Sequence, residues 1–135
     1  TDGHIDDITR FVAPGTVVTV VEPDTQDANY APLQENLSRL RTARDANGRL
    51  LQVIELPMPP RSDGPHQRNP ASHANFYIGN CAVLVPIFGS PTDSIALDRL
   101  RPFFPSRKIV GIDCRDLVAG LGAIHCITQQ IPAIS

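Results

Sequence analysis

A histidine and a carboxylate near the beginning of this sequence could act together with a cysteine near its end. His4 and Asp6 are separated by one residue, and Cys126 lies close to the opposite terminus. A thiol that attacks an electrophilic carbon needs a general acid or base beside it and a group that orients the substrate. Only folding can bring these segments together, and the sequence therefore predicts an enzyme that uses a thiol nucleophile.

A zinc site is the main competing interpretation, with His4, Asp6, His125 and Cys126 as its ligands. These residue types suit zinc. Structural zinc sites usually place their ligands in tight pairs such as CxxC or HxxxH, however, and only His4 and Asp6 resemble a pair. We therefore expect a site that contains no metal and needs no cofactor.

The other polar and thiol residues are expected to have structural roles. Asp7 is more typical of a cap or a surface charge than of a catalytic group. His125 directly precedes Cys126, and adjacent side chains of an extended segment point in opposite directions, so that we expect a structural hydrogen bond from His125. Cys81 and Cys114 are assigned to the core. His66, Arg68 and His73 are assigned to a polar loop.

Composition excludes several classes of partner. The net charge of −2 provides no basic surface for nucleic acid or for an anionic membrane. No apolar run approaches the roughly 18 residues of a membrane span, and no signal peptide is visible. The three cysteines include no CxxC pair, which argues against a disulfide framework and favours a reducing cytoplasm.

Hydrophobic patterning predicts an α/β chain made of two strand-and-helix modules, residues 1–70 and 71–135. The predicted strands cover residues 16–21, 50–56, 76–78, 82–87 and 108–112. The predicted helices run from Tyr30 to a stop at Asn47 and Gly48, from a capping box at Ser90 through Leu100, and over residues 114–118. Residues 57–70 carry Pro, Gly, Ser, Asp and Arg without periodicity, which predicts an exposed loop of the length often found in lids or specificity elements.

Six short segments of the sequence are more specific evidence of a protein family than the residue types alone. They are residues 1–7 (TDGHIDD), 10–15 (RFVAPG), 30–33 (YAPL), 75–78 (NFYI), 85–89 (VPIFG) and 120–130 (GLGAIHCITQQ). In this order they resemble the C-terminal part of the agmatine deiminase family, which also contains the bacterial type of peptidylarginine deiminase. Members of that family are well over twice as long as this chain. The chain begins without Met at the His4 motif, which suggests a domain cut, a proteolytic fragment or an incomplete record.

The resemblance implies that Cys126 is the nucleophile, His4 the general acid and base, and Asp6 a carboxylate that binds the substrate. The implied enzyme is a hydrolase acting on C–N bonds of linear amidines, and it converts agmatine to N-carbamoylputrescine and ammonia in putrescine biosynthesis. The best-known agmatine deiminases read Gly-Gly-Gly-Asn/Gly-Ile-His-Cys before the nucleophile, whereas this chain reads GLGAIHC. Peptidyl-arginine or another guanidine is therefore an alternative substrate.

The chemistry of a guanidinium group explains why these residue types would be needed. A Cys126 thiolate could add to the guanidinium carbon and expel ammonia, leaving a covalent thiouronium. His4 would protonate the ammonia and then activate the water that releases the product. Asp6 would accept two hydrogen bonds from the planar cation. His4 and Asp6 would face one pocket if they lie on a strand, where residues two positions apart point the same way.

The resemblance also implies the pentein architecture, an α/β propeller of five ββαβ-type modules around a central active site. Two such modules would fit in this chain, and residues 57–70 would lie at the substrate entrance. The further carboxylates of the family come from its N-terminal part, so that we expect the isolated chain to be inactive. Expected partners are a small guanidine substrate, the remainder of the parent chain and a second copy of the protein. The alternative is a non-catalytic assembly fragment whose apolar edges need a partner.

Overall fold

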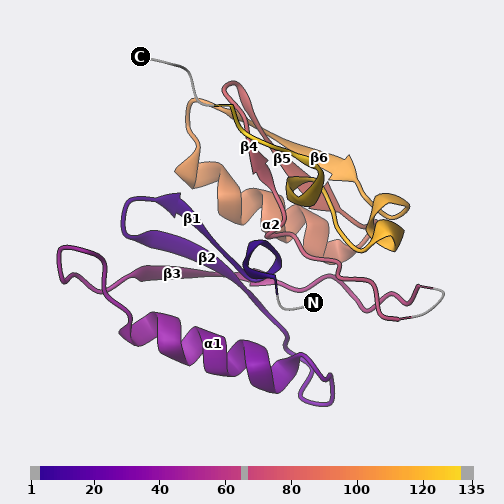
Figure 1. Cartoon of the computed structure of the whole chain (residues 1–135), viewed down its shortest axis with the longest axis horizontal. Coiled ribbons are helices and arrows are strands. Elements are labelled where there is room, and N and C mark those ends of the chain that lie inside the picture. The colour runs from indigo at the N-terminus through magenta and orange to yellow at the C-terminus, as the bar shows by residue number, and fades with distance from the viewer. Residues whose placement is uncertain (1–3, 65–66, 132–135) are drawn as a thin grey trace.

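Two three-stranded sheets form the framework of the described residues, 4–64 and 67–131 of a computed structural model (Figure 1). Each sheet is mixed, because its central strand pairs antiparallel with one neighbour and parallel with the other. One helix covers the outer side of the first sheet, and a second helix lies between the two sheets. The α/β class predicted from the sequence is confirmed.

The first sheet has the order β1-β2-β3 and uses helix α1 as a crossover. Its elements are β1 (Thr9–Ala13), β2 (Thr16–Val21), α1 (Tyr30–Thr42) and β3 (Gln52–Pro57). The strand predicted over residues 16–21 is confirmed. This β-branched run forms the central strand and is almost wholly buried, as expected for a strand that is covered on both faces.

The second sheet repeats the scheme in the order β4-β5-β6. Its elements are β4 (Tyr77–Ile78), β5 (Ala82–Ile87), α2 (Pro91–Leu100) and β6 (Lys108–Asp113). Both halves of the chain therefore follow the order strand, strand, helix, strand, with the antiparallel pair first and the parallel pair closed by a helix. The strand β6 was predicted to be buried, but it lies at the edge of its sheet and is only partly covered.

Local interactions set the bounds of both helices. The predicted capping box of α2 is present, and the Ser90 N–H donates a hydrogen bond of 3.0 Å to Asp93. Helix α1 ends at Thr42, before the predicted stop, and is followed by a turn over residues 45–48, whose last residue Gly48 has a φ of +77°. The strand β3 accordingly begins two residues later than predicted, since Leu50 pairs with Arg44 in an isolated bridge.

The hydrophobic core lies between the sheets and is continuous from one to the other. It combines buried side chains from β1, β2, β3, α1, β5 and α2 with those of two connecting segments. These buried residues are Val12, Val18, Val20, Leu33, Leu56, Met58, Ala74, Phe76, Val83, Val85, Leu100 and Phe104. Burial of this apolar surface is the main favourable contribution to folding, and it fixes the two halves against each other. No helix of the described residues combines the length and the apolar character that crossing a membrane requires.

The predicted exposed loop, residues 57–70, is only partly exposed. Pro57 belongs to β3, and Met58, Pro59 and Pro70 are buried. Residues 65 and 66, including the predicted loop residue His66, lie outside the described residues. The Arg68 side chain ties the loop to the first half of the chain, since its Nη1 lies 2.6 Å from Asp27 Oδ1 in a largely buried ion pair. The helix predicted over residues 114–118 is instead a 3-10 turn at Leu117–Gly120.

Two further residue assignments from the sequence are wrong. Cys81 was assigned to the core, but it is exposed in the turn between β4 and β5, whereas Cys114 is buried as predicted. His73 was assigned to a polar loop, but its side chain is completely buried. Its Nδ1 donates to the Pro86 carbonyl at 2.9 Å, and its Nε2 therefore accepts from the Thr92 hydroxyl at 3.0 Å. His73 joins the segment before β4 to the end of β5 and the start of α2.

The buried imidazole predicts a pH dependence of stability. Burial lowers the pKa of His73 below its ordinary value, although the Pro86 carbonyl and the Asp93 charge oppose this shift. Below about pH 6.5 the unfolded chain binds a proton that folded His73 does not bind, so the free energy of unfolding decreases as the pH falls toward the lowered pKa. We expect the melting temperature of the protein to decrease between about pH 7 and about pH 5, and to decrease less in His73→Gln. An equal decrease in both proteins would contradict this role of His73.

Candidate active site

The site begins at a 3-10 turn, Ile5–Asp7, that precedes β1. The strand on which His4 and Asp6 would face one pocket does not form, since the turn is closed by a hydrogen bond of 3.1 Å from the Asp7 N–H to the His4 carbonyl. The potential ligand atoms of His4, Asp6 and Asp7 nevertheless all lie within 4.8 Å of one another. Asp7 is buried, so that its assignment as a surface charge is also wrong.

A second 3-10 turn, His125–Ile127, brings the opposite end of the chain to Asp6. The Cys126 Sγ lies 3.3 Å from Asp6 Oδ2, and the His125 Nδ1 lies 2.8 Å from the same oxygen. The two adjacent side chains were predicted to diverge in an extended segment. They converge instead, because the turn rotates successive side chains by less than the half-turn of a strand. His125 forms a hydrogen bond, as expected, and its partner is Asp6.

The buried side chain of Asn75 connects these two turns. Its Nδ2 lies 3.1 Å from Asp6 Oδ2, 2.9 Å from Asp7 Oδ1 and 3.1 Å from Cys126 Sγ. Its Oδ1 accepts a hydrogen bond of 2.9 Å from the His125 N–H. Sequence reasoning did not single out Asn75, although it begins one of the six segments quoted above. The signal available in the sequence was a polar residue directly before Phe76, at the start of a predicted strand.

Arg10 is a second residue of the site that sequence reasoning missed. Its guanidinium lies 5.0 Å from the centre of the Phe76 ring, and its Nη1 donates a hydrogen bond of 3.0 Å to the Phe76 carbonyl. Burial lowers the pKa of Arg10, while the charges of Asp6 and Cys126 oppose this shift. The side chain therefore places a positive charge close to the carboxylate and the thiol.

The electrostatics of the site favour an ionised carboxyl group beside a protonated thiol. Burial would raise the pKa of Asp6, but hydrogen bonds from His125 and Cys126 outweigh it and lower this pKa. Burial raises the pKa of Cys126, and the hydrogen bond and charge of Asp6 act in the same direction. Hydrogen bonds from Asn75 and from the Ala123 backbone partly offset this increase in the pKa of Cys126.

The zinc interpretation predicted a different set of neighbours. Among the described residues, the group whose potential ligand atoms lie within 4.8 Å of one another consists of His4, Asp6 and Asp7, without His125 or Cys126. Asp6 Oδ2 is also occupied by hydrogen bonds to His125, Asn75 and Cys126. In the described residues the thiol and the carboxylate are thus hydrogen-bonded to each other.

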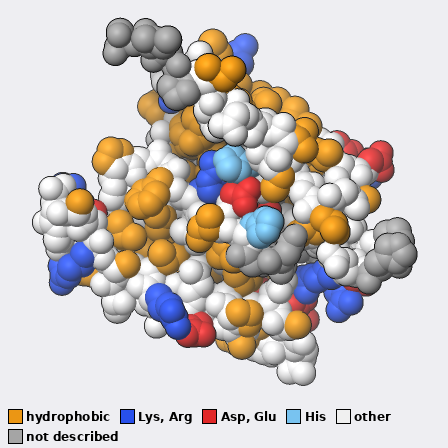
Figure 2. Space-filling model, in the orientation of Figure 1, with side chains coloured by type: hydrophobic (Ala, Val, Ile, Leu, Met, Phe, Trp, Pro, Cys, Tyr) orange, Lys and Arg blue, Asp and Glu red, His pale blue; other side chains and the backbone are white. Residues whose placement is uncertain are grey.

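The charged residues of the site stand out from an apolar surface. Figure 2 shows histidine, acidic and basic side chains gathered near the centre of one face, with hydrophobic side chains around them. Ile5 and Ile127, which adjoin the two turns, are each 67% exposed. Both turns of the site thus carry an exposed hydrophobic side chain next to its polar residues.

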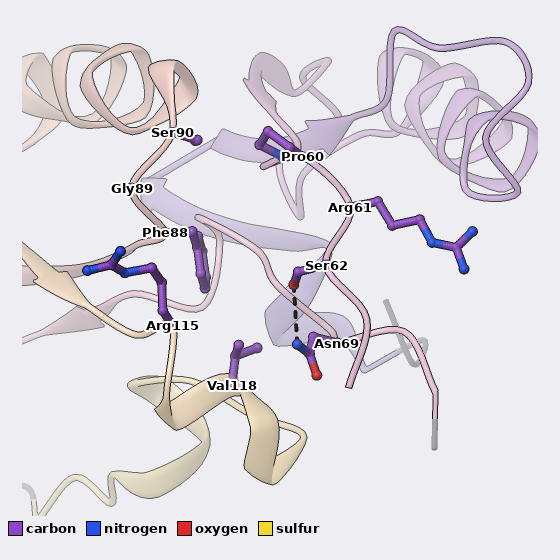
Figure 3. A pocket seen from close by; sticks show the side chains of 9 residues that line it. All are labelled: Pro60, Arg61, Ser62, Asn69, Phe88, Gly89, Ser90, Arg115 and Val118. Atoms are coloured by element: carbon purple, nitrogen blue, oxygen red, sulfur yellow. Dashed lines mark hydrogen bonds between the residues drawn. The ribbon is translucent and has the colours of Figure 1, made fainter. Parts of the chain in front are cut away.

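A separate pocket of about 360 Å³ involves the segment predicted to be a specificity loop (Figure 3). One side of the pocket is lined by Pro60, Arg61, Ser62 and Asn69 of that segment. The Asn69 side-chain amide donates a hydrogen bond to the Ser62 hydroxyl. Phe88, Gly89, Ser90, Arg115 and Val118 line the other side. None of these lining residues belongs to the hydrogen-bonded group around Asp6. A specificity role for residues 57–70 thus stays a prediction.

The fold is an α/β arrangement of two strand-strand-helix-strand units. Its candidate site contains an exposed thiol, a carboxylate and two histidines, which come from the two ends of the chain. The model of the Porphyromonas-type peptidyl-arginine deiminase family matches residues 1–132. The chain belongs to this family.

Individual relatives agree with this assignment. A "Putative agmatine deiminase" of Legionella pneumophila (strain Paris) is 41% identical over 133 residues, which are 98% of this chain and 38% of that protein. The crystal structure of a "Putative Arginine Deiminase" from Porphyromonas gingivalis matches with a TM-score of 0.93 and 42% identity, over 98% of this chain and 39% of that chain. An agmatine deiminase of Enterococcus faecalis matches with a TM-score of 0.90 and 36% identity, over 98% of this chain and 41% of that chain.

This chain thus spans about two fifths of the length of the relatives that it matches. It corresponds to their C-terminal portion, as the order of the six segments predicted. The predicted resemblance to the agmatine deiminase and peptidylarginine deiminase family is confirmed.

Proposed function

We propose that this chain is the part of a guanidine deiminase that carries its nucleophile, and that the whole enzyme hydrolyses agmatine to N-carbamoylputrescine and ammonia. The observation that carries the proposal is the approach of Cys126 Sγ to Asp6 Oδ2, 3.3 Å apart although they come from opposite ends of the chain. A thiol and a carboxylate at this separation can contact the carbon and the nitrogens of one guanidinium group at the same time.

The first half of the reaction forms a covalent intermediate. A guanidinium held by Asp6 brings a positive charge close to Cys126 and thereby favours its thiolate. The Cys126 Sγ adds to the guanidinium carbon, and the C–N bond to the departing nitrogen breaks as protonated His4 gives that nitrogen a proton. Ammonia leaves, and the carbon remains bonded to sulfur as a thiouronium. The cluster of His4 with Asp6 and Asp7 supports this role, because it places the imidazole beside the carboxylate that is proposed to hold the substrate.

The second half restores the free enzyme. Neutral His4 takes a proton from a water molecule, whose oxygen attacks the thiouronium carbon. The C–S bond then breaks, the ureido product leaves, and sulfur departs as a thiolate. Asp6 holds the remaining guanidino nitrogens during both halves, and Arg10, Asn75 and His125 hold Asp6 and Cys126 in place. The S–H proton of Cys126 and the hydroxyl proton of the second adduct pass to solvent, and the other protons move between His4, water and the substrate nitrogen.

Two of the matched structures support agmatine as the substrate. The Enterococcus faecalis agmatine deiminase is described as catalysing its reaction. A cysteine-to-serine variant of the C. jejuni agmatine deiminase, with substrate bound, matches with a TM-score of 0.82 and 33% identity over 93% of this chain and 36% of that chain. Replacing a cysteine nucleophile by serine is a way to trap a substrate that the native thiol would consume.

Peptidyl-arginine is the second candidate substrate, since the matched family model carries that name. The exposed position of Cys126 would admit an arginine side chain that remains attached to a polypeptide. Another small guanidine would also fit the proposed contacts. Comparing ammonia release from agmatine and from N-acylated arginine amides distinguishes these substrates.

We further propose that the two strand-strand-helix-strand units, residues 1–70 and 71–135, are two modules of a five-module pentein propeller. The matching topology of the two sheets supports this proposal. The remainder of the family domain would then cover the apolar surface around the site, and a second copy of the protein could add to this cover. A cytoplasmic enzyme fits the free thiols, and a non-catalytic assembly role is the alternative if the whole protein proves inactive.

The proposed function predicts that ammonia release from agmatine needs no added metal but needs a free thiol. Activity of the whole protein should persist in EDTA and should disappear after treatment with iodoacetamide, because alkylation blocks the Cys126 Sγ. Ammonia can be quantified directly, and mass spectrometry of the digested protein identifies the alkylated cysteine. Full activity in protein that is completely alkylated at Cys126 would overturn the proposed function.

A further inference from the structure

Asn75 offers fewer hydrogen atoms than its neighbours can accept. Its amide nitrogen has two N–H groups and lies within 3.1 Å of three acceptors: Asp6 Oδ2, Asp7 Oδ1 and Cys126 Sγ. The amide orientation follows from its surroundings, since the opposite orientation would place the carbonyl oxygen against two carboxylates. The two N–H groups therefore cannot serve all three neighbours fully.

The contact with Asp7 takes one of these N–H groups. It is the shortest of the three, at 2.9 Å, and both residues are almost completely buried. The second N–H is left between Asp6 Oδ2 and Cys126 Sγ, each 3.1 Å from the nitrogen. The carboxylate and the thiol thus compete for one hydrogen-bond donor.

The backbone around Asn75 prevents the amide from turning away. The His125 N–H is shared between the Asn75 side-chain oxygen at 2.9 Å and the Asn75 backbone carbonyl at 3.1 Å. These two contacts fix the amide plane to the turn that carries Cys126. A shift of the second N–H from Asp6 to Cys126 therefore needs only a small movement of the acceptors.

We propose that Asn75 is a positioning residue that couples substrate binding to ionisation of Cys126. This inference rests on the proposed function. A guanidinium that donates to Asp6 reduces the demand of that carboxylate for other donors, and the Asn75 N–H then turns to Cys126 Sγ. The S–H bond of Cys126 breaks and its proton passes to solvent, which reaches this exposed side chain, while the electron pair stays on sulfur. A bound cation thus increases the thiolate fraction of Cys126 above the fraction that the Asn75 N–H supports in the free enzyme.

The first test compares Asn75→Ala with the wild type in the whole protein. The rate of Cys126 alkylation by iodoacetamide is measured against pH by mass spectrometry of the Cys126 peptide. Loss of one hydrogen bond to a charged atom should reduce this rate at pH 7 by about 10- to 100-fold, while the plateau rate at high pH should not change. With agmatine, kcat should fall by a similar factor and KM should change little, because the lost contact forms after binding.

Asn80→Ala is the matched control, since Asn80 is exposed in the turn between β4 and β5. This variant should resemble the wild type in both measurements. If Asn75→Ala does not fold, Asn75→Ser provides the same test with one smaller donor, and a partial reduction is then expected. An unchanged pH profile of alkylation, or a reduction that is equal at every pH, would overturn the inference.

A double-mutant cycle tests the competition itself. Asp6→Ala removes the competing acceptor and a negative charge, so that Cys126 should be alkylated faster at pH 7 than in the wild type. The same substitution in an Asn75→Ala background should have a smaller effect, because no donor is left to be released. If the changes in alkylation rate caused by the two substitutions simply multiply in the double variant, the proposed coupling is overturned. Alkylation requires no turnover, so an inactive wild type would contradict the proposed function and still leave this cycle informative.

Discussion

Cys126→Ser should reduce ammonia release from agmatine by at least about a thousandfold, because the hydroxyl of serine is a much weaker nucleophile at neutral pH. Cys81→Ser should retain nearly full activity. Both cysteines are exposed, but only Cys126 lies beside Asp6 and Asn75. Cys81 is therefore a control for solvent access as well as for the loss of a thiol. Initial rates at saturating agmatine provide the measurement.

Cys114→Ser separates catalysis from stability. Cys114 is completely buried, and its replacement places a hydroxyl in an apolar cluster with Ala123 and Ile124. We expect a lower melting temperature with little change in the activity of the folded protein. Comparable losses of activity in all three variants would indicate that the thiols matter for folding and would contradict the role proposed for Cys126.

The second large effect concerns the 135-residue chain by itself, which should show little or no turnover of agmatine. Positioning of the reacting groups can supply a large part of the rate enhancement of an enzyme. Within the described residues, the proposed clamp for the substrate is Asp6, and the adjoining Ile5 and Ile127 are open to solvent. A guanidinium bound there would remain hydrated and mobile, and the thiolate would rarely meet it in a productive pose.

Complementation provides the measurement. Ammonia release is compared for this chain alone, for the chain mixed with the remaining portion of the family domain, and for the intact enzyme. Activity should appear only in the last two samples. Circular dichroism confirms that the isolated chain has its α/β content. Turnover by the folded chain alone at the rate of the intact enzyme would show that the other portion is dispensable.

Much of the fold could be predicted from the sequence because its signals are local. The β-branched run of β2, the helical spacing in α1 and the capping residues of α2 each specify their own element. The ends of the elements were predicted less accurately where turns set them, as in the connection after α1, which contains Gly48 in a left-handed conformation. The strand β6 was predicted to be buried but is only partly covered, because its edge position depends on the order of the strands in the sheet.

The site was predictable in its residue types and less so in its geometry. His4, Asp6 and Cys126 were found from chemistry and from a family resemblance, and the structure places Asp6 in contact with Cys126 and close to His4. The turn at Ile5–Asp7 was not predicted, because three-residue turns have no periodic signal. Asn75 was missed since its importance lies in contacts with residues far away in the sequence.

The same distance in sequence has a consequence for the order of events during synthesis. Asp6 and Cys126 are 120 residues apart, so a ribosome that adds 5–20 residues per second makes the thiol roughly 6 to 24 s after the carboxylate. Closing a loop of this length carries an entropic cost that the contacts formed earlier by the two sheets reduce. The contact between Asp6 and Cys126 therefore forms late, after most of both sheets has been synthesised. The contact between Cys126 and Asp6 is accordingly a late marker of folding, and a ligand that bridges the two turns would stabilise the folded chain.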